Sequence, residues 1–357
     1  MNTLSKYREP PFDHHPMCTY LKLLILVLIC ALFSSNPAQG GQAQFEIKLA
    51  TLAPENSSLM KIFQDMNSEL QKETDGRVGL QLFSGFVLGE ERDIFRKLRI
   101  GLLHAATFTS TFLINMNPDI RAIQVPFLFN NYEEVDYVME KMSVEFNKTF
   151  AKKGYQVLGW TEVGFIYVMT TVPIRTVEDL KGKKVWTSAD SSMANAVFEE
   201  AQTSPVTIAA SDVLVALQTD LVEIVFNSPY YALVTQWYTR IQYIIDVPLA
   251  YIGGALIIDN KTFSRLSPRD QETTKRVCAK YVRRLTLRTR KDNQEALEVM
   301  LKRGVKKIQL QPAEFERFKQ LVHEAIRELD PAVLHRDTLR KVQSMLEHYR
   351  ATRKDKS

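Results

Sequence analysis

The sequence predicts an α/β protein of two lobes with a cleft between them. Short apolar strands alternate with helices between residues 45 and 108, and the same order restarts after Trp160. Helices that separate short apolar strands are typical of parallel sheets covered on both faces, so two such series predict two lobes. A long helical pattern from Pro268 to about Arg303 suits a helix lying across both. Ligands of such sheets bind beyond the carboxyl ends of the strands.

The first series begins with an alternating strand at Phe45–Leu52. Asn56 or Ser57 can cap the helix that follows, which runs to Glu73. The next expected elements are a turn at Asp75-Gly76, a strand at Val78–Phe83, a helix at Glu90–Ile100 and a strand at Ala105–Phe108.

The second series contains a β-rich run at Phe165–Val168, a short helix that Thr176 can cap, and a strand opening at Lys184. A helix at Ser191–Gln202, a strand near Val206, a helix at Ser211–Leu217 and a strand near Ile224 follow. Ser267 is a good cap for the long helix, which Gly304 closes. Further helices are expected at Pro312–Leu329 and Thr338–Arg350.

Residues 1–43 read as an export signal. A basic lead precedes the unbroken apolar run Leu23–Phe33, and small residues follow at 38–43. The apolar run is about half the length that spans a bilayer, although the long basic lead leaves an uncleaved anchor open. Cys30 follows Ile29 rather than the small residue that lipidation favours. Removal of the signal leaves Cys278, a buried apolar filler, and predicts a soluble periplasmic protein.

The net charge is +5, with basic residues gathered at Lys280–Lys291 and Arg350–Lys356. A nucleic-acid patch is one interpretation of the first cluster. A solvated helix face is favoured, because apolar residues recur on the other side and an exported protein rarely meets DNA. We therefore expect no nucleic-acid partner.

Seven short motifs, in order and at matching spacing, resemble the TRAP-transporter solute-binding proteins (DctP family). The strongest is P-I-R-T-V-E-D-L-K-G-K-K at Pro173–Lys184, and V-P-F-L-F at Val125–Phe129 resembles the family's L-P-F-L-F. The others are A-P-E-N-S-S from Ala53, S-G-F-V-L-G-E-E from Ser84, S-D-V-L-V-A-L-Q from Ser211, L-V-E-I-V-F-N-S-P from Leu221 and L-S-P-R-D-Q from Leu266.

The resemblance implies the two-lobed periplasmic solute-binding protein fold, with hinge strands and a long C-terminal helix spanning the lobes. Residues 44–163 plus 252–291 would form lobe I, residues 164–251 plus 292–330 lobe II, and residues 331–357 a C-terminal helix and basic tail. It implies a small-molecule ligand delivered to TRAP membrane permease subunits, and no cofactor.

Departures from the family pattern gather at the ligand. The resemblance places Trp186 where the family carries its carboxylate-clamping arginine, and Ile166 where a second arginine stands in G-x-R-x-x-T-N. Leu52, Thr109 and Phe112 replace polar or charged positions. Three further ligand-side positions are Ala210, which replaces a ring, Ala189, which ends the run after Trp186, and Asn227, which is kept and flanked by Phe226.

These substitutions favour a largely apolar ligand. A carboxylate buried in a closed cleft needs charge-assisted hydrogen bonds, and burying it alone costs several kcal/mol. The set Trp186, Ile166, Leu52 and Phe112 offers no cation. Removing about 300 Å² of apolar ligand surface from water supplies roughly 7 kcal/mol before association costs. Asn227, with Tyr230 or Thr109, would orient the ligand.

Simpler structural interpretations stand beside these. Trp186 can fill the core beneath the cleft, Ile166 can be a core residue, and Asn227 can stabilise the turn before Pro229. Tyr230 and Tyr231 point opposite ways on any strand, so at most one is expected to face the cleft.

The sequence also bears on functions other than solute binding. No motif with diagnostic catalytic or metal-ligand spacing is present, so an enzyme is not expected. A partner-binding component that works with a periplasmic tetratricopeptide-repeat protein is an alternative, motivated by Trp186 and Ile166. A carboxylate binder that uses a non-standard cation is another.

Overall fold

The computed structural model describes residues 44–85, 87–187 and 192–354, which fall within one compact unit. The predicted export signal, residues 1–43, lies outside this part of the chain. The strands are β1 (Phe45–Ala50), β2 (Val78–Phe83), β3 (Ala105–Thr109), β4 (Tyr155–Thr170), β5 (Lys184–Thr187), β6 (Ser204–Thr207), β7 (Ile224–Asn227), β8 (Tyr243–Ile245), β9 (Ala250–Asp259) and β10 (Lys306–Ile308).

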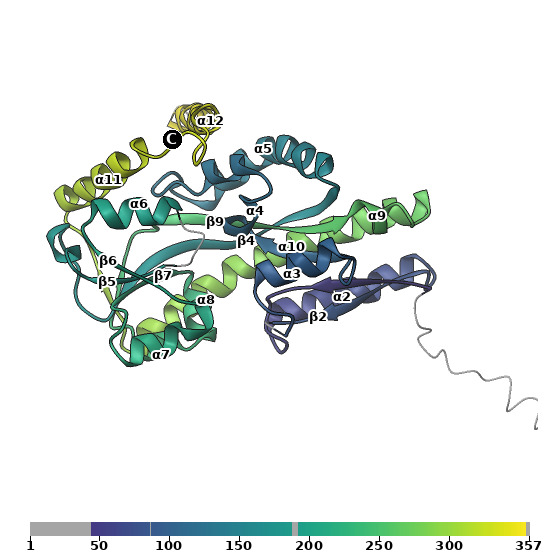
Figure 1. Ribbon diagram of the computed structural model, residues 1–357, viewed down its shortest axis with the longest axis horizontal. Helices are drawn as coiled ribbons and strands as arrows, with labels where there is room; N and C mark the ends of the chain where they lie inside the picture. Colours follow the sequence, from purple (N-terminus) through teal and green to yellow (C-terminus); the bar gives the residue numbers. More distant parts are fainter. Residues whose placement is uncertain (1–43, 86, 188–191, 355–357) are drawn as a thin grey trace, which may run out of the picture. The chain divides into compact units, whose positions relative to one another are not determined.

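The helices cover both halves of the sheet (Figure 1). They are α2 (Ser58–Glu73), α3 (Glu91–Arg99), α4 (Ser110–Leu113), α5 (Tyr132–Lys152), α6 (Ser192–Glu200), α7 (Val213–Gln218), α8 (Pro229–Val234), α9 (Asn260–Phe263), α10 (Pro268–Lys302), α11 (Pro312–Arg327) and α12 (Arg336–Lys354). Short 3-10 turns lie at η1 (Pro118–Ile123), η2 (Glu178–Leu180), η3 (Ala210–Asp212) and η4 (Trp237–Thr239). Among the described residues, no helix combines the length and apolar character needed to cross a membrane.

The sheet is mixed, which corrects the expectation of parallel sheets throughout. Its order is β2-β1-β3-β9-β4-β7-β5-β6, with β8 paired to β4 and β10. The strands of the two expected α/β series pair in parallel, β1 with β2 and β3, and β5 with β6 and β7. The antiparallel pairs all involve β4 or β9, which run through the middle of the sheet. The alternation of helices and strands along the sequence could not predict these antiparallel strands, because antiparallel pairs need no crossover helix between them.

The long ladder between β4 and β9 is interrupted by two bulges, at Val157/Gly159 and Glu162/Gly164. Gly164 has φ of 97°, and a Cβ there would lie 2.7 Å from the Tyr132 hydroxyl. On β9, a Cβ at Gly254 would lie 2.7 Å from the carbonyl oxygen of Phe108. The glycines therefore permit close approach of β4 and β9 to their neighbours.

Helix α10 begins where the sequence indicates, because the Ser267 hydroxyl accepts from the backbone N–H of Asp270 at 3.1 Å. It contacts α2, β4 and α8 and so crosses both halves of the sheet (Figure 1). Its basic face pairs with α2: Lys280 lies 2.6 Å from Glu69, and Arg284 lies 3.4 Å from Asp65. Both pairs are exposed to solvent, which screens them, so each contributes little to stability.

Apolar cores lie on both faces of the sheet. One joins α2 and α10 to the β1 half and includes Cys278, which is fully buried, and a second joins α4, α5 and α12 to the other face. Two more, around Trp237 and around Ile174, belong to the β5–β7 half. This arrangement is the expected α/β architecture, whereas the exact lobe boundaries stay a prediction because β4 and β9 run through both halves.

The C-terminal helix α12 is anchored by an ion pair, so the basic segment from Arg350 to Lys354 is not a loose tail. Arg350 Nη2 lies 2.7 Å from the Glu134 carboxylate, whose side chain is 4% exposed. Burial alone would raise the pKa of Glu134, but the hydrogen bonds from Arg350 and Asn130 outweigh it, and the net pKa lies below the ordinary 4.5. The pair therefore stabilises the fold above pH 4.5, and this contribution is lost as the pH falls through the lowered folded pKa.

We predict that Arg350→Met lowers the free energy of unfolding by about 2 kcal/mol at neutral pH, because it leaves the Glu134 carboxylate buried without its cation. The loss should shrink in acid, where Glu134 is protonated. Urea denaturation across this pH range measures both effects. The double variant Arg350→Met/Glu134→Gln is the matched control and should recover part of the stability; an equal loss at all pH values would contradict the assignment.

Candidate ligand-binding site

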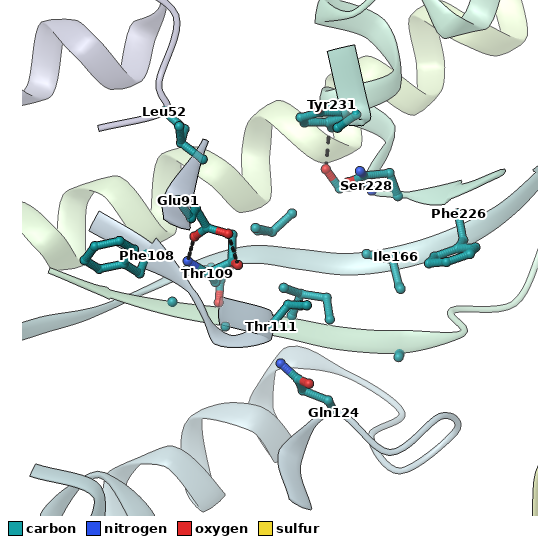
Figure 2. A pocket seen from close by; sticks show the side chains of 18 of the residues that line it. Leu52, Glu91, Phe108, Thr109, Thr111, Gln124, Ile166, Phe226, Ser228 and Tyr231 are labelled. Carbon is teal, nitrogen blue, oxygen red and sulfur yellow. Dashed lines mark hydrogen bonds between the residues drawn. The ribbon is translucent and has the colours of Figure 1, made fainter. Parts of the chain in front are cut away.

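A cavity of about 620 Å³ lies between the β1–β3 half and the β5–β7 half of the structure. Its walls come from the loop after β1, from β3 and the start of α3, and from β4, β5, β7, α6 and α8. In the view of Figure 2, Leu52 and Tyr231 lie on one side, Gln124 on the other, and Ile166 between them. The surface facing the cavity is mostly apolar. Its size is within the usual range of ligand pockets.

Most of the residues predicted from the sequence line this one cavity. They are Leu52, Thr109, Ile166, Trp186, Ala210, Phe226, Asn227 and Tyr230. Phe112 is not among the lining residues: its ring stacks on Phe108 at 4.9 Å and is 8% exposed. Ala189 lies outside the described residues. The structure thus brings these eight residues together around one cavity.

Trp186 belongs both to the core and to the cavity wall. The side chain is 7% exposed, and its indole N–H donates to the carbonyl oxygen of Ile208 at 3.2 Å. The ring lies 5.4 Å from Phe226 and 5.4 Å from Trp237, centroid to centroid. The ring therefore does not fill the cleft, and it presents one face to the cavity while its other contacts support β5.

Asn227 has a structural role at the end of β7. Its side-chain oxygen accepts from the backbone N–H of Ser228 at 2.8 Å, and the Ser228 hydroxyl in turn caps α8 by accepting from the Tyr231 N–H at 3.3 Å (Figure 2). The side-chain NH₂ of Asn227 keeps its donors, so the residue stabilises the turn and still offers hydrogen bonds toward the cavity.

Thr109 is held by Glu91 at the start of α3. The Glu91 carboxylate accepts from the Thr109 backbone N–H at 2.5 Å and from its hydroxyl at 2.9 Å (Figure 2). The same hydroxyl accepts from the Phe112 N–H at 3.3 Å and so caps α4. With its proton donated to Glu91, Thr109 can only accept from a ligand.

Tyr230 and Tyr231 both line the cavity, which corrects the expectation that one of them at most would face it. The expectation assumed a strand, whereas the two residues lie on helix α8, where neighbours are about 100° apart. Asn293 of α10 fixes this helix by accepting from the Tyr230 N–H at 3.0 Å and donating to the Val163 carbonyl oxygen at 2.9 Å. Burial, with Glu90 and Glu91 nearby, raises the pKa of Tyr231 to about 12.

Arg121 also lines the cavity, so the expectation of a wall without a cation was wrong. It lies on η1, five residues before Pro126, at a position the comparison with family ligand-side residues did not cover. Its Nη1 donates to the carbonyl oxygen of Val333. Burial lowers the pKa of the guanidinium, which stays charged.

Other charged groups at the cavity are acidic. Glu162 is neutralised by Arg290, whose Nε lies 2.8 Å from it, and it also accepts from the Tyr251 hydroxyl at 3.2 Å. Glu90 lies at the start of α3, and burial with nearby Asp93 and Asp212 raises its pKa. Within the described ranges, no group of three His, Cys, Asp or Glu side chains could hold a metal ion.

Residues 49–330 match the model of a protein family described as bacterial extracellular solute-binding protein, family 7, or DctP. The protein belongs to the DctP family. The family binds solutes, so this DctP protein is a substrate-binding component of transport and not an enzyme.

Solved structures support the fold. The DctP protein superimposes with a TM-score of 0.78 on the sugar acid binding protein DctPAm from Advenella mimigardefordensis, solved with galactonate, at 18% identity over 86% of this chain and 99% of that one. A TRAP periplasmic solute binding protein from Ochrobactrum anthropi, with its C-terminus bound in the ligand pocket, gives 0.77 at 21% identity, covering 87% and 98% of the two chains.

Curated relatives are distant. The DctP protein is 27% identical over 234 residues to a solute-binding protein of Verminephrobacter eiseniae, covering 64% of this chain and 69% of the relative. It is 23% identical over 310 residues to an uncharacterized protein of Haemophilus influenzae, covering 85% and 93%.

We predict that Trp186→Ala lowers the free energy of unfolding by about 3–5 kcal/mol without any ligand, because it empties a space packed by Phe226 and Trp237. Trp186→Phe keeps most of the ring but cannot make the indole hydrogen bond, so the free energy of unfolding should fall by only about 1–2 kcal/mol. Urea denaturation measures both, with Leu102→Ala at an exposed site as the control. An unchanged urea midpoint for Trp186→Ala would show that packing of the ring does not contribute to stability.

Proposed function

We propose that this DctP protein is the solute receptor of a TRAP-type transport system, and that it binds a largely apolar ligand with few polar groups. The observation that carries the proposal is the mostly apolar cavity, with Trp186 on β5 and Ile166 on β4 among its lining residues. It would act in the periplasm after export by its N-terminal signal.

The physical argument is a difference in desolvation. Ile166 is 8% exposed and Trp186 is 7% exposed, and neither donates a charge-assisted hydrogen bond to a bound acid. A ligand covered with hydroxyl and carboxylate groups would lose its hydration at these side chains without replacement, at several kcal/mol per unpaired charged group. An apolar body loses nothing there and gains about 25 cal/mol for each Å² removed from water.

Neighbouring structures were solved with polar acids, among them orotic acid in the protein from Desulfovibrio salexigens and β-D-galacturonate in the one from Xanthobacter autotrophicus. Both are under 25% identical to this chain, so a different ligand is compatible with the shared fold. We assign the protein to the subgroup of the family that lacks the ligand-clamping arginine, on the strength of Trp186 and Ile166.

The expected partners are the membrane permease subunits that receive the ligand. A periplasmic tetratricopeptide-repeat protein remains a second predicted partner, since an apolar ligand is poorly soluble and would benefit from a protected path.

The direct test is native mass spectrometry of the protein purified from its own host. We expect a bound compound that is released into organic solvent and that is poor in hydroxyl groups. A sugar acid or small dicarboxylate found in the cavity at full occupancy would overturn the proposal.

We predict that Leu52→Gln weakens binding of the neutral apolar dye N-phenylnaphthylamine about tenfold, because an amide at the cavity wall loses hydrogen bonds to water when the dye covers it. Dye fluorescence titration gives the dissociation constant. The control is Leu102→Gln, the same change at a side chain that is 58% exposed outside the cavity. Equal effects of the two changes would place dye binding elsewhere.

A further inference from the structure

Arg121 is a cation in an apolar cavity whose hydrogen-bonding capacity is mostly unused. A guanidinium carries five N–H donors. Within the described residues, Arg121 has one interaction, from Nη1 to the backbone carbonyl oxygen of Val333, and no carboxylate partner. Arg290, by contrast, which pairs with Glu162 of the cavity wall, is held by both Glu162 and Asp136.

The carboxylates of the cavity do not neutralise Arg121. Glu162 is paired with Arg290, and Glu91 is held by the N–H and hydroxyl of Thr109. Glu90 lies beside Glu91 at the start of α3, and both act on Tyr231. Arg121 is half-buried and has no counter-charge within the described residues, so an anion entering the cavity would regain at Arg121 part of the hydration that it loses.

The polar groups are also unevenly placed. Gln124 immediately follows η1, which carries Arg121, and its Nε2 donates to the Ser110 hydroxyl at 2.5 Å with one N–H left. In Figure 2, Gln124 lies across the cavity from Leu52, Glu91 and Tyr231. The η1 side thus offers donors, whereas the α3 side presents the Glu90 carboxylate. Trp186 and Phe226 form an apolar wall of the same cavity.

We propose that Arg121 binds the one anionic group of an amphipathic ligand, a monocarboxylic acid, whose apolar body lies against Trp186 and Phe226. This inference rests on the proposed apolar-ligand function and narrows its ligand class. A second carboxylate on the same ligand would meet Glu90 at the start of α3, so dicarboxylates are disfavoured.

The test compares three straight-chain probes of equal length, decanoate, decanol and decanedioate, by displacement of N-phenylnaphthylamine from the full mature protein at neutral pH. We expect decanoate to bind about tenfold more tightly than decanol, because its carboxylate accepts charge-assisted hydrogen bonds from Arg121. Decanedioate should bind more weakly than decanoate, and Glu90→Gln should reduce that difference.

Arg121→Gln should abolish the preference for decanoate over decanol, because it weakens decanoate binding about tenfold more than decanol binding. Arg121→Lys keeps the charge without the planar fork and should restore part of the preference, and it also serves if Arg121→Gln folds poorly. Arg175→Gln, at an exposed arginine outside the cavity, is the matched control and should behave as the unaltered protein.

The outcomes separate the two proposals. Equal affinities for decanoate and decanol in the unaltered protein would overturn the role of Arg121 and leave the apolar receptor standing. A preference that survives Arg121→Gln, or an equal loss for both probes in that variant, would also overturn it. Binding of neither probe would refute the apolar-ligand function itself, and the inference with it.

Discussion

A buried ion pair between α10 and β4 holds together the part of the fold on which the cavity depends. Arg290 donates from Nε to Glu162 at 2.8 Å, and Glu162 lies at a bulge of β4 on the cavity wall. The Glu162 side chain is 1% exposed, so its carboxylate requires this partner. The same guanidinium contacts Asp136 of α5 and lies over the ring of Tyr132. One arginine thus joins three elements beside the cavity.

Some side chains of the cavity wall also hold the fold together through hydrogen bonds, whereas Arg121 makes few hydrogen bonds with the described part of the protein. Trp186 supports β5 through Ile208, Asn227 stabilises the start of α8, and Thr109 links α3 to α4. The Trp186 N–H and the Thr109 hydroxyl proton are occupied by the protein itself, whereas the NH₂ of Asn227 keeps its donors. Arg121 differs, since most of its donors have no partner within the described residues.

The main elements could be predicted because their signals are local. Ser267 and Gly304 mark the ends of α10, and Ser57 caps α2, since caps depend on a few adjacent residues. The antiparallel direction of β4 and β9 could not be predicted, because the spacing of strands along the sequence does not show which distant strands pair. Tyr231 was misjudged because the run before it continued a strand pattern, although Ser228-Pro229 is a helix-start signal.

The site was predictable only where the family motifs marked it. Eight predicted residues line one cavity, and five of them lie at the carboxyl ends of β1, β3, β5 and β7, which converge there: Leu52, Thr109, Trp186, Phe226 and Asn227. Phe112 packs in the core instead. It lies on the short helix α4, where its ring stacks on that of Phe108 and does not line the cavity. Arg121 carried no motif, and only its three-dimensional placement reveals it.

The shared strands β4 and β9 have a mechanical consequence. Because both run through the two halves, no single loop serves as a free pivot between them. Widening the cavity must flex these strands, most easily at the bulges beside Gly159 and Gly164, where the ladder is already interrupted. Helix α10 lies along β4 and must bend or slide with it. Any opening of the cavity would therefore have to bend these two strands, and their backbone hydrogen bonds would resist the bending.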